Sequence, residues 1–88
     1  MRGVEAVQEK QQLSPLMRFY QAQRTMNRMW HAMRYARLNL LDLKGRPFVS
    51  SRQRAEAHEL IRSTRMLYLE AQNEFFECHK ALMDIIFK

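Results

Sequence analysis

Glycine and proline are scarce in this 88-residue chain, which contains two of each. Because β-sandwiches and barrels need such residues at their many turns, the shortage favours a few long helices. The single cysteine, Cys78, excludes a disulfide within the chain and with it a small secreted domain stabilised by disulfides. No apolar run approaches the ~18 to 20 residues that a membrane span requires. We therefore expect an intracellular chain, cytoplasmic or organellar (mitochondria included), that is not secreted and has no transmembrane segment.

Acidic residues are also few, since nine of them stand against fifteen basic residues and leave a net charge of +6. Eleven of the basic residues are arginine, and seven methionines accompany them. Such a chain attracts anionic partners, whether a nucleic acid or an anionic membrane surface. Protein interfaces are likewise enriched in Arg, Met, Trp and Tyr and depleted in Lys. A protein assembly therefore explains this composition without requiring a phosphate.

A first helix is predicted from Pro15 to Leu43. Ser14 can cap its first free N–H groups, and proline at the first helical position gives up a donor that has no partner there. Gly45 is expected to end the helix by adopting left-handed backbone angles. Apolar residues recur at steps of three and four, which is a helical pattern: Leu16, Phe19, Ala22, Met26, Met29, Met33, Ala36, Leu40 and Leu43.

A second helix is predicted from Ser51 to Phe87. Ser50, with Gln53 three residues later, has the spacing of a capping box. Residues at alternating steps of four and three form a second apolar stripe: Ala57, Ile61, Thr64, Tyr68, Ala71, Phe75, Cys78, Leu82 and Ile85.

The connection between the two helices is short, so they are expected to pack antiparallel. The predicted fold is all-α: an antiparallel two-helix hairpin with helices at about 15–43 and 51–87, completed into a bundle by self-association or by partner chains. Residues 15–88 form the hairpin domain, and residues 1–14 form an N-terminal segment that is flexible or a short helix.

Large apolar side chains of the first helix also lie outside its stripe. Trp30 and Leu41 border the stripe, whereas others lie among the arginines on the far side, where the second helix cannot cover them: Met17, Tyr20, Tyr35 and Leu38. At ~1.5 to 3 kcal/mol for each such side chain fully buried, self-association or docking is favoured over leaving them in water. The sequence therefore predicts a non-catalytic interaction or scaffold subunit. Its partners are other protein chains, either further copies or the subunits of a larger complex.

The predicted helices differ in length, at about 43 Å and about 55 Å for a rise of ~1.5 Å per residue. Pairing backward from the turn brings Pro15 level with about His79, so the end of the second helix projects past its partner. The projecting segment contains Leu82, Met83, Ile85, Ile86 and Phe87. We expect another chain to cover it in preference to Val4, Val7 and Leu13 of the N-terminal segment, because three apolar residues are too few to cover five.

A basic patch at the turn is the basis of an alternative function. It comprises Arg34, Arg37, Lys44, Arg46, Arg52 and Arg54, with Asp42 expected as the only counter-charge beside them. The N-terminus of the second helix adds backbone donors, which makes this the best anion site in the sequence. The alternative is a small basic nucleic-acid-binding protein, although the acidic residues of the second helix would repel a phosphate backbone.

No pattern for catalysis, a cofactor or a metal is found. His58-Glu59 begins like the zinc-protease pattern H-E-x-x-H, but Arg62 stands where the second histidine is needed. Near the C-terminus, Cys78 lies on the apolar stripe and His79 points about 100° away from it, so they do not converge on one metal. We therefore expect no enzyme activity, no cofactor and no metal site.

Overall fold

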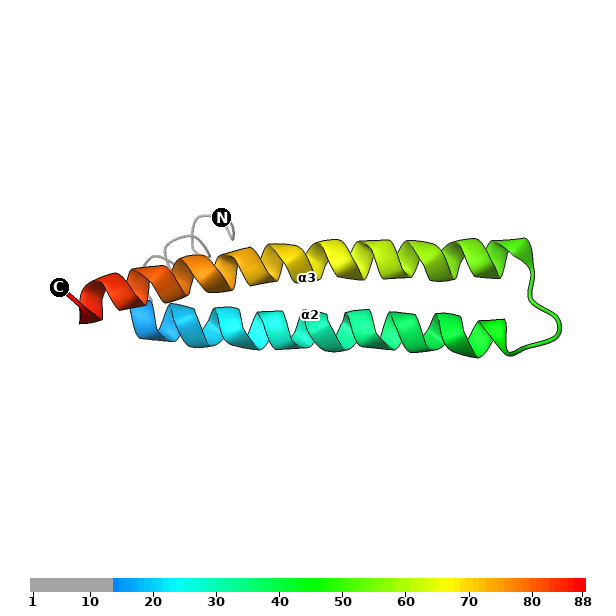
Figure 1. Ribbon diagram of the computed structural model, residues 1–88, viewed down its shortest axis with the longest axis horizontal. Helices are drawn as coiled ribbons and strands as arrows, with labels where there is room; N and C mark the ends of the chain where they lie inside the picture. Colours follow the sequence, from blue (N-terminus) through cyan, green and yellow to red (C-terminus); the bar gives the residue numbers. More distant parts are fainter. Residues whose placement is uncertain (1–13) are drawn as a thin grey trace, which may run out of the picture.

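The computed structural model describes residues 14–88, and these form two long antiparallel helices. Helix α2 spans Pro15–Lys44 and helix α3 spans Ser51–Ile86, with a short turn between them (Figure 1). The prediction of an all-α hairpin is confirmed, and each helix ends within one residue of the predicted position. In this article the turn end is the end of the hairpin with the connection. The open end is the opposite one, where α2 begins and α3 finishes.

Both helix starts have the predicted caps. The Ser14 hydroxyl accepts a hydrogen bond from the backbone N–H of Met17 at 3.2 Å, with Pro15 in the first helical position. At the start of α3, the Ser50 hydroxyl accepts from the backbone N–H of Gln53 at 3.1 Å, and the Gln53 side chain accepts from the backbone N–H of Ser50 at 3.0 Å. The capping box therefore satisfies two N–H groups that a helix start otherwise leaves unpaired.

The end of α2 differs from the prediction. Gly45 has φ −80° and ψ −8°, which is right-handed backbone, so the predicted left-handed conformation is wrong. Helix-like geometry continues for one more residue, and the Gly45 N–H donates to the carbonyl oxygens of Leu41 and Asp42 at 3.3 and 3.2 Å. Those two bonds pair the last carbonyl groups without a change of handedness, so the turn does not depend on glycine.

Replacing Gly45 with alanine is expected to raise the free energy of unfolding by about 0.4 to 1 kcal/mol, because alanine restricts the unfolded chain and fits this backbone without strain. A Cβ built on Gly45 meets nothing closer than the Asp42 carbonyl oxygen at 3.5 Å, an ordinary contact. Urea unfolding followed by circular dichroism measures the change. A loss of 1 kcal/mol or more would mean that the residue adopts left-handed angles in solution.

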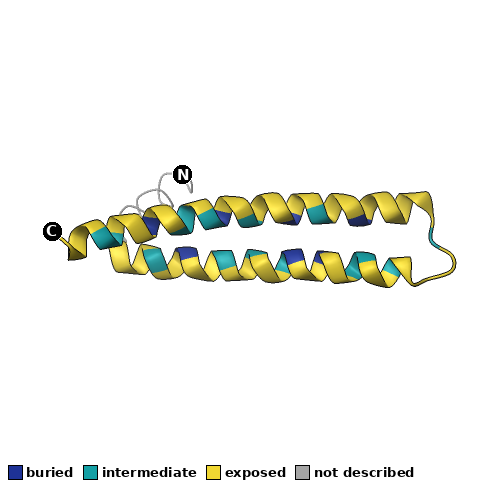
Figure 2. Ribbon diagram, in the orientation of Figure 1, coloured by how far each residue is buried: buried dark blue, intermediate teal, exposed yellow. Residues whose placement is uncertain are grey.

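The side chains between the helices are mostly small. Within residues 14–88, seven side chains are buried, and four of them are alanines (Figure 2). They are Ala22, Met33, Ala36, Ala57, Thr64, Ala71 and Cys78. No large side chain of the described hairpin is fully buried. The buried residues all belong to the two predicted stripes, so the stripes are confirmed as the contact seam, but the core is thin.

An aromatic contact near the open end defines the axial register of α2 against α3. The rings of Phe19 and Phe75 lie with their centroids 5.1 Å apart. Counting along both helices from this contact brings Ala22 level with Ala71, and Ala36 level with Ala57, to within one residue. Two buried alanine pairs therefore let the helices approach closely. The same count confirms that Pro15 lies level with about His79, so α3 extends past the start of α2 (Figure 1).

Candidate protein-docking surface

Large apolar side chains cover much of the hairpin surface. Within residues 14–88, sixteen large hydrophobic residues are exposed, more than twice the number of buried residues. They are Leu16, Met17, Tyr20, Trp30, Tyr35, Leu38, Leu41, Phe48, Leu60, Met66, Leu67, Leu69, Phe76, Ile85, Ile86 and Phe87. Single exposed apolar residues are ordinary, but contiguous sets of them mark interaction surfaces.

Most of the side chains predicted to contact a partner belong to this exposed set. The six from α2 are exposed, as are three from the end of α3, whereas Leu82 and Met83 are half-buried. Phe87 is 81% exposed, because α3 runs past the end of its partner helix there. These residues remain predicted contacts. The proposal that Val4, Val7 and Leu13 cover the end of α3 lies outside the described residues.

Sequence reasoning missed several exposed apolar residues of α3 and the turn: Phe48, Leu60, Met66, Leu67, Leu69 and Phe76. The sequence does contain a signal for those in α3, because they are apolar residues at positions outside the a/d stripe, where polar residues are expected. Written as heptads abcdefg, the seam of each helix falls at a and d, with Phe19 and Phe75 both at a. Leu69, Phe76 and Met83 then all fall at b, one heptad apart, which is a second apolar line on α3.

One long side of the hairpin, called here the aromatic side, carries a cluster of five rings near the open end. Phe19 contacts Tyr20 at 5.9 Å and His79 at 5.8 Å between ring centroids, and Phe75 contacts Phe76 at 5.8 Å. Phe19 and Phe75 are half-buried in the seam, whereas the other three rings are exposed. The cluster therefore joins the seam to an exposed aromatic surface that spans both helices.

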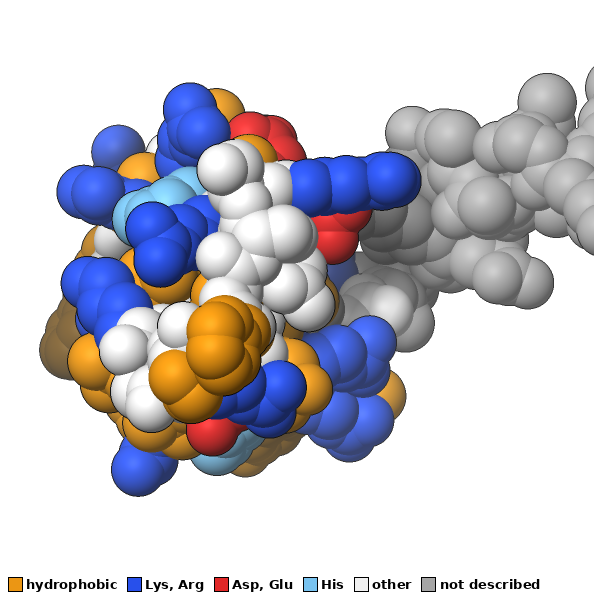
Figure 3. Space-filling model, turned by 90° about the vertical axis from the view of Figure 1, so that its right-hand side faces the viewer, with side chains coloured by type: hydrophobic (Ala, Val, Ile, Leu, Met, Phe, Trp, Pro, Cys, Tyr) orange, Lys and Arg blue, Asp and Glu red, His pale blue; other side chains and the backbone are white. Residues whose placement is uncertain are grey.

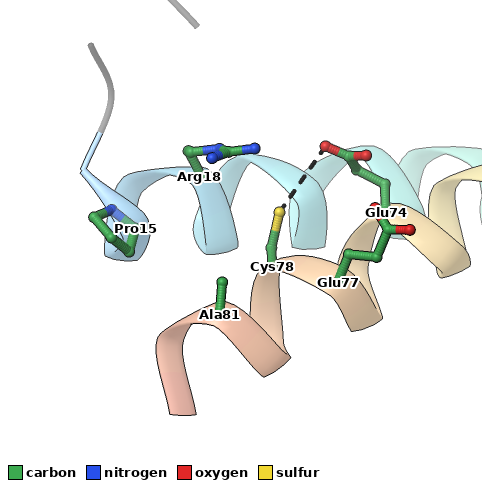
Figure 4. Close-up of a pocket in the computed structure, with 6 residues that line it drawn as sticks. All are labelled: Pro15, Arg18, Glu74, Glu77, Cys78 and Ala81. Carbon is green, nitrogen blue, oxygen red and sulfur yellow. Dashed lines mark hydrogen bonds between the residues drawn. The ribbon is translucent and has the colours of Figure 1, made fainter. Parts of the chain in front are cut away.

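The opposite long side carries a small pocket (Figure 4). Pro15 and Arg18 of α2 line it together with four residues of α3: Glu74, Glu77, Cys78 and Ala81. Inside it, the thiol of Cys78 donates to Oε1 of Glu74 at 3.9 Å. Its volume of about 90 Å³ is well below the roughly 300 to 1,000 Å³ of small-molecule sites. Three of the six residues that line the pocket are charged, in contrast to the ring cluster on the aromatic side.

The turn end is basic, with an acid paired to part of it. In Figure 3, which faces this end, lysine and arginine side chains surround apolar ones. All six side chains of the predicted patch are exposed. Arg46 pairs with Asp42 at 2.7 Å, as the sequence suggested, but Arg52 also pairs with Glu56 at 3.1 Å. Asp42 is therefore confirmed as a counter-charge, but the expectation that it is the only one beside the patch is wrong, since Glu56, four residues along the helix from Arg52, supplies another.

Trp30 is held in place by neighbours on its own helix. The guanidinium carbon of Arg34 lies 5.6 Å from the centroid of the Trp30 ring, and the His31 ring packs edge-on at 5.2 Å. A cation over an aromatic face is favourable, and at an exposed site such a contact is modest in energy. Arg34 of the predicted basic patch is therefore also part of the tryptophan surface.

Two further findings bear on function. Within the described part of the chain, no group of three or more His, Cys, Asp or Glu side chains converges as metal ligands would. Neither α2 nor α3 combines the length and apolar character that a bilayer crossing demands.

No protein-family model, curated protein or solved structure matches the chain.

Proposed function

We propose that the chain is a non-catalytic helical interaction subunit, which docks into a protein assembly or self-associates through its exposed apolar surfaces. The observation that carries the proposal is the contrast between the sixteen exposed large hydrophobic residues and the absence of any fully buried large side chain in the described hairpin. A domain of this size gains little stability from its own core. Contact with another helical surface would supply the burial that the hairpin lacks.

Light scattering on the purified chain, combined with thermal melting at several concentrations, tests the proposal. We expect either a mass above the 10.7 kDa of one chain, with a melting temperature that rises with concentration, or poorly cooperative melting of the isolated chain. A 10.7 kDa monomer that melts cooperatively at a temperature independent of concentration would overturn it, because the hairpin would then be stable without a partner.

A second candidate function, binding of single-stranded nucleic acid at the turn end, is favoured by one observation. Phe48, in the turn, is 93% exposed and lies two residues from Arg46 in the sequence. An exposed ring beside arginines is the combination on which bases stack while phosphates are neutralised. The ion pairs of Arg46 and Arg52 count against it, since both carboxylates must give way to phosphate.

The turn-end candidate predicts that changing Arg46, Arg52 and Arg54 together to alanine weakens binding to a single-stranded oligonucleotide. At ~0.7 per phosphate contact on a single strand, the slope of log K against log salt should fall by about 2. The matched control changes three arginines in the first half of α2, Arg18, Arg24 and Arg28, and removes the same charge. Fluorescence anisotropy measures both variants. An equal loss in the two variants would contradict a site at the turn, and undetectable binding at low salt would eliminate the function.

A further inference from the structure

Half of the aromatic side is free of charged residues. The heptad positions beside the seam on this side are e and b, because His79 at e contacts Phe19 across the seam and Tyr20 at b contacts the same ring. Toward the open end, no described residue in these positions is Asp, Glu, Lys or Arg: Leu16, Tyr20, Gln23, Asn27, Leu69, Gln72, Phe76, His79, Met83 and Ile86. Toward the turn, the same positions contain five basic residues: Arg34, Arg37, Lys44, Arg62 and Arg65.

What we call the open-end face consists of six apolar residues of the uncharged half and three more at the neighbouring f positions: Leu16, Tyr20, Leu69, Phe76, Met83 and Ile86 at e and b, with Met17, Met66 and Phe87 at f. Two basic residues, Arg24 and Lys80, also occupy f positions at this end. All nine apolar residues of the face are exposed except Met83, which is half-buried. With roughly 200 Å² for the full surface of a large apolar residue, their exposed fractions amount to about 900 Å². A standard stable interface uses about 800 Å² of each partner. The face is therefore large enough for a dimer.

The spacing of these residues along α3 is symmetric about Phe76. Leu69 precedes Phe76 by seven residues, and Met83 follows it by seven. If two α3 helices cross antiparallel with a two-fold axis at Phe76, each Phe76 meets its counterpart, and each Leu69 meets Met83 of the other copy. Farther out, at the edge of the overlap, Phe87 comes level with Arg65 of the other copy and within one residue of its Met66. The same patch can thus cover itself, as a two-fold dimer requires.

We propose that the open-end face binds the same face of a second copy of this chain, with the two-fold axis at Phe76. The inference rests on the proposed function and names its partner. Sliding the copies into full overlap would place the apolar half of one against Arg34, Arg37 and Arg62 of the other. Arg62 pairs with Glu59 of its own helix at 3.5 Å, but no acid occupies the e and b positions that would face Arg34 and Arg37. Burying unpaired charges is costly, so pairing at the open ends alone is favoured.

The same arrangement keeps the basic ends apart. We call the dimer in which only the open ends overlap the end-overlapped dimer. Its two-fold axis lies 25 residues from Ser51 along α3, so the two Ser51 residues are separated by about 75 Å at ~1.5 Å per residue. This is many times the screening length of ~8 Å at physiological salt, so the turn ends do not repel each other. A fully overlapped antiparallel dimer would shorten the separation to about 50 Å, and a parallel one would bring the basic ends together.

The test is sedimentation equilibrium of the full chain and of two matched variants. Phe76→Arg places two like charges at the axis, whereas Leu67→Arg makes a comparable change on the other long side of α3. Both residues are exposed, at 56% and 48%, so both variants should fold. We expect a dimer whose dissociation constant rises at least about 100-fold with Phe76→Arg and less than about 3-fold with Leu67→Arg. Circular dichroism confirms equal helix content.

The register is tested by the distance between spin labels on Ser51→Cys, introduced in a Cys78→Ala background so that each copy carries one label. Pulsed electron resonance should give a separation of about 75 Å. A separation near 50 Å, or below 30 Å, would overturn the end-overlapped arrangement.

The outcomes separate this inference from the proposed function. A dimer unaffected by Phe76→Arg, or equally affected by Leu67→Arg, overturns the inference and leaves an interaction subunit that uses another surface. A monomer that melts poorly also overturns it, with the proposed function intact and a different protein as the partner. A monomer that melts cooperatively overturns both.

Discussion

Replacing Ala36 with leucine is expected to lower the free energy of unfolding by about 3 kcal/mol, in the upper part of the range for overpacked sites. Ala36 is 0% exposed and comes level with the buried Ala57 of α3, so two small side chains meet where the helices pack closely. A leucine there has no space to occupy. It must push the helices apart and loosen the packing of Met33, the largest of the buried side chains, one turn away.

The matched control is Ala55→Leu, at an exposed position of α3 in the same half of the hairpin. Leucine and alanine have similar helix propensities, so this change should stay within about 0.5 kcal/mol. Urea midpoints at one fixed protein concentration compare the two variants. Equal midpoints would show that the helices are not closely packed at Ala36. A large effect confined to Ala36 would support the alanine pairs as the determinant of the helix spacing.

The helix boundaries and the seam were predictable because each depends on local chemistry. Ser14 and Ser50 have side chains that bond to the first N–H groups of a helix, and this geometry involves only three or four consecutive residues. The seam follows from the spacing of apolar residues, and all seven buried side chains lie on it. Gly45 was mispredicted because two types of helix end satisfy the last carbonyl groups. Only the backbone angles distinguish them.

The candidate surface was less predictable, because it depends on how far the partner helix reaches. Ile85 belongs to the stripe of α3 but is exposed, since it lies near the open end, where the seam runs out. Leu16 was counted in the stripe of α2, but with Phe19 at a it falls at e, beside the seam, and it is exposed as well. Phe76 was overlooked because the prediction followed only the a/d stripe of α3, which faces α2. The second apolar line of α3, at the b positions, includes Phe76 and was not considered. The structure adds that the Phe76 ring contacts Phe75 and the Tyr20 ring contacts Phe19, so both exposed rings belong to the cluster centred on the contact of Phe19 with Phe75.

The basic patch shows a different limit. Arg52 and Glu56 stand four residues apart, a spacing that allows ion pairs on one helix face, so their 3.1 Å contact could have been expected. The contact of Arg34 with Trp30 has the same spacing. Exposed pairs of this kind contribute little to stability, and they compete only weakly with another anion. They reduce the number of unpaired charges in the patch without removing its basic character.

Phe19→Ala is expected to cost about 2 to 3 kcal/mol, below the 3 to 5 of a fully buried phenylalanine because Phe19 is half-buried. The ring is the centre of the aromatic cluster, in contact with Phe75, Tyr20 and His79. Its removal leaves a gap at the open end, where α2 has no buried side chain between Pro15 and Ala22. The adjacent part of α3 should then fray.

Phe48→Ala is the matched control, because it removes the same ring from a position that is 93% exposed, and it should leave the free energy of unfolding within about 0.5 kcal/mol of the parent. Urea unfolding of Phe19→Ala, Phe75→Ala and the double variant completes a cycle. Aromatic pairs couple by about 0.5 to 1.5 kcal/mol beyond the area they bury, so the double variant should lose less than the two single losses added together. Strict additivity would mean that the 5.1 Å contact does not hold the open end closed. Coupling in that range would make Phe19 and Phe75 the contact that keeps Tyr20 and Phe76 on one surface.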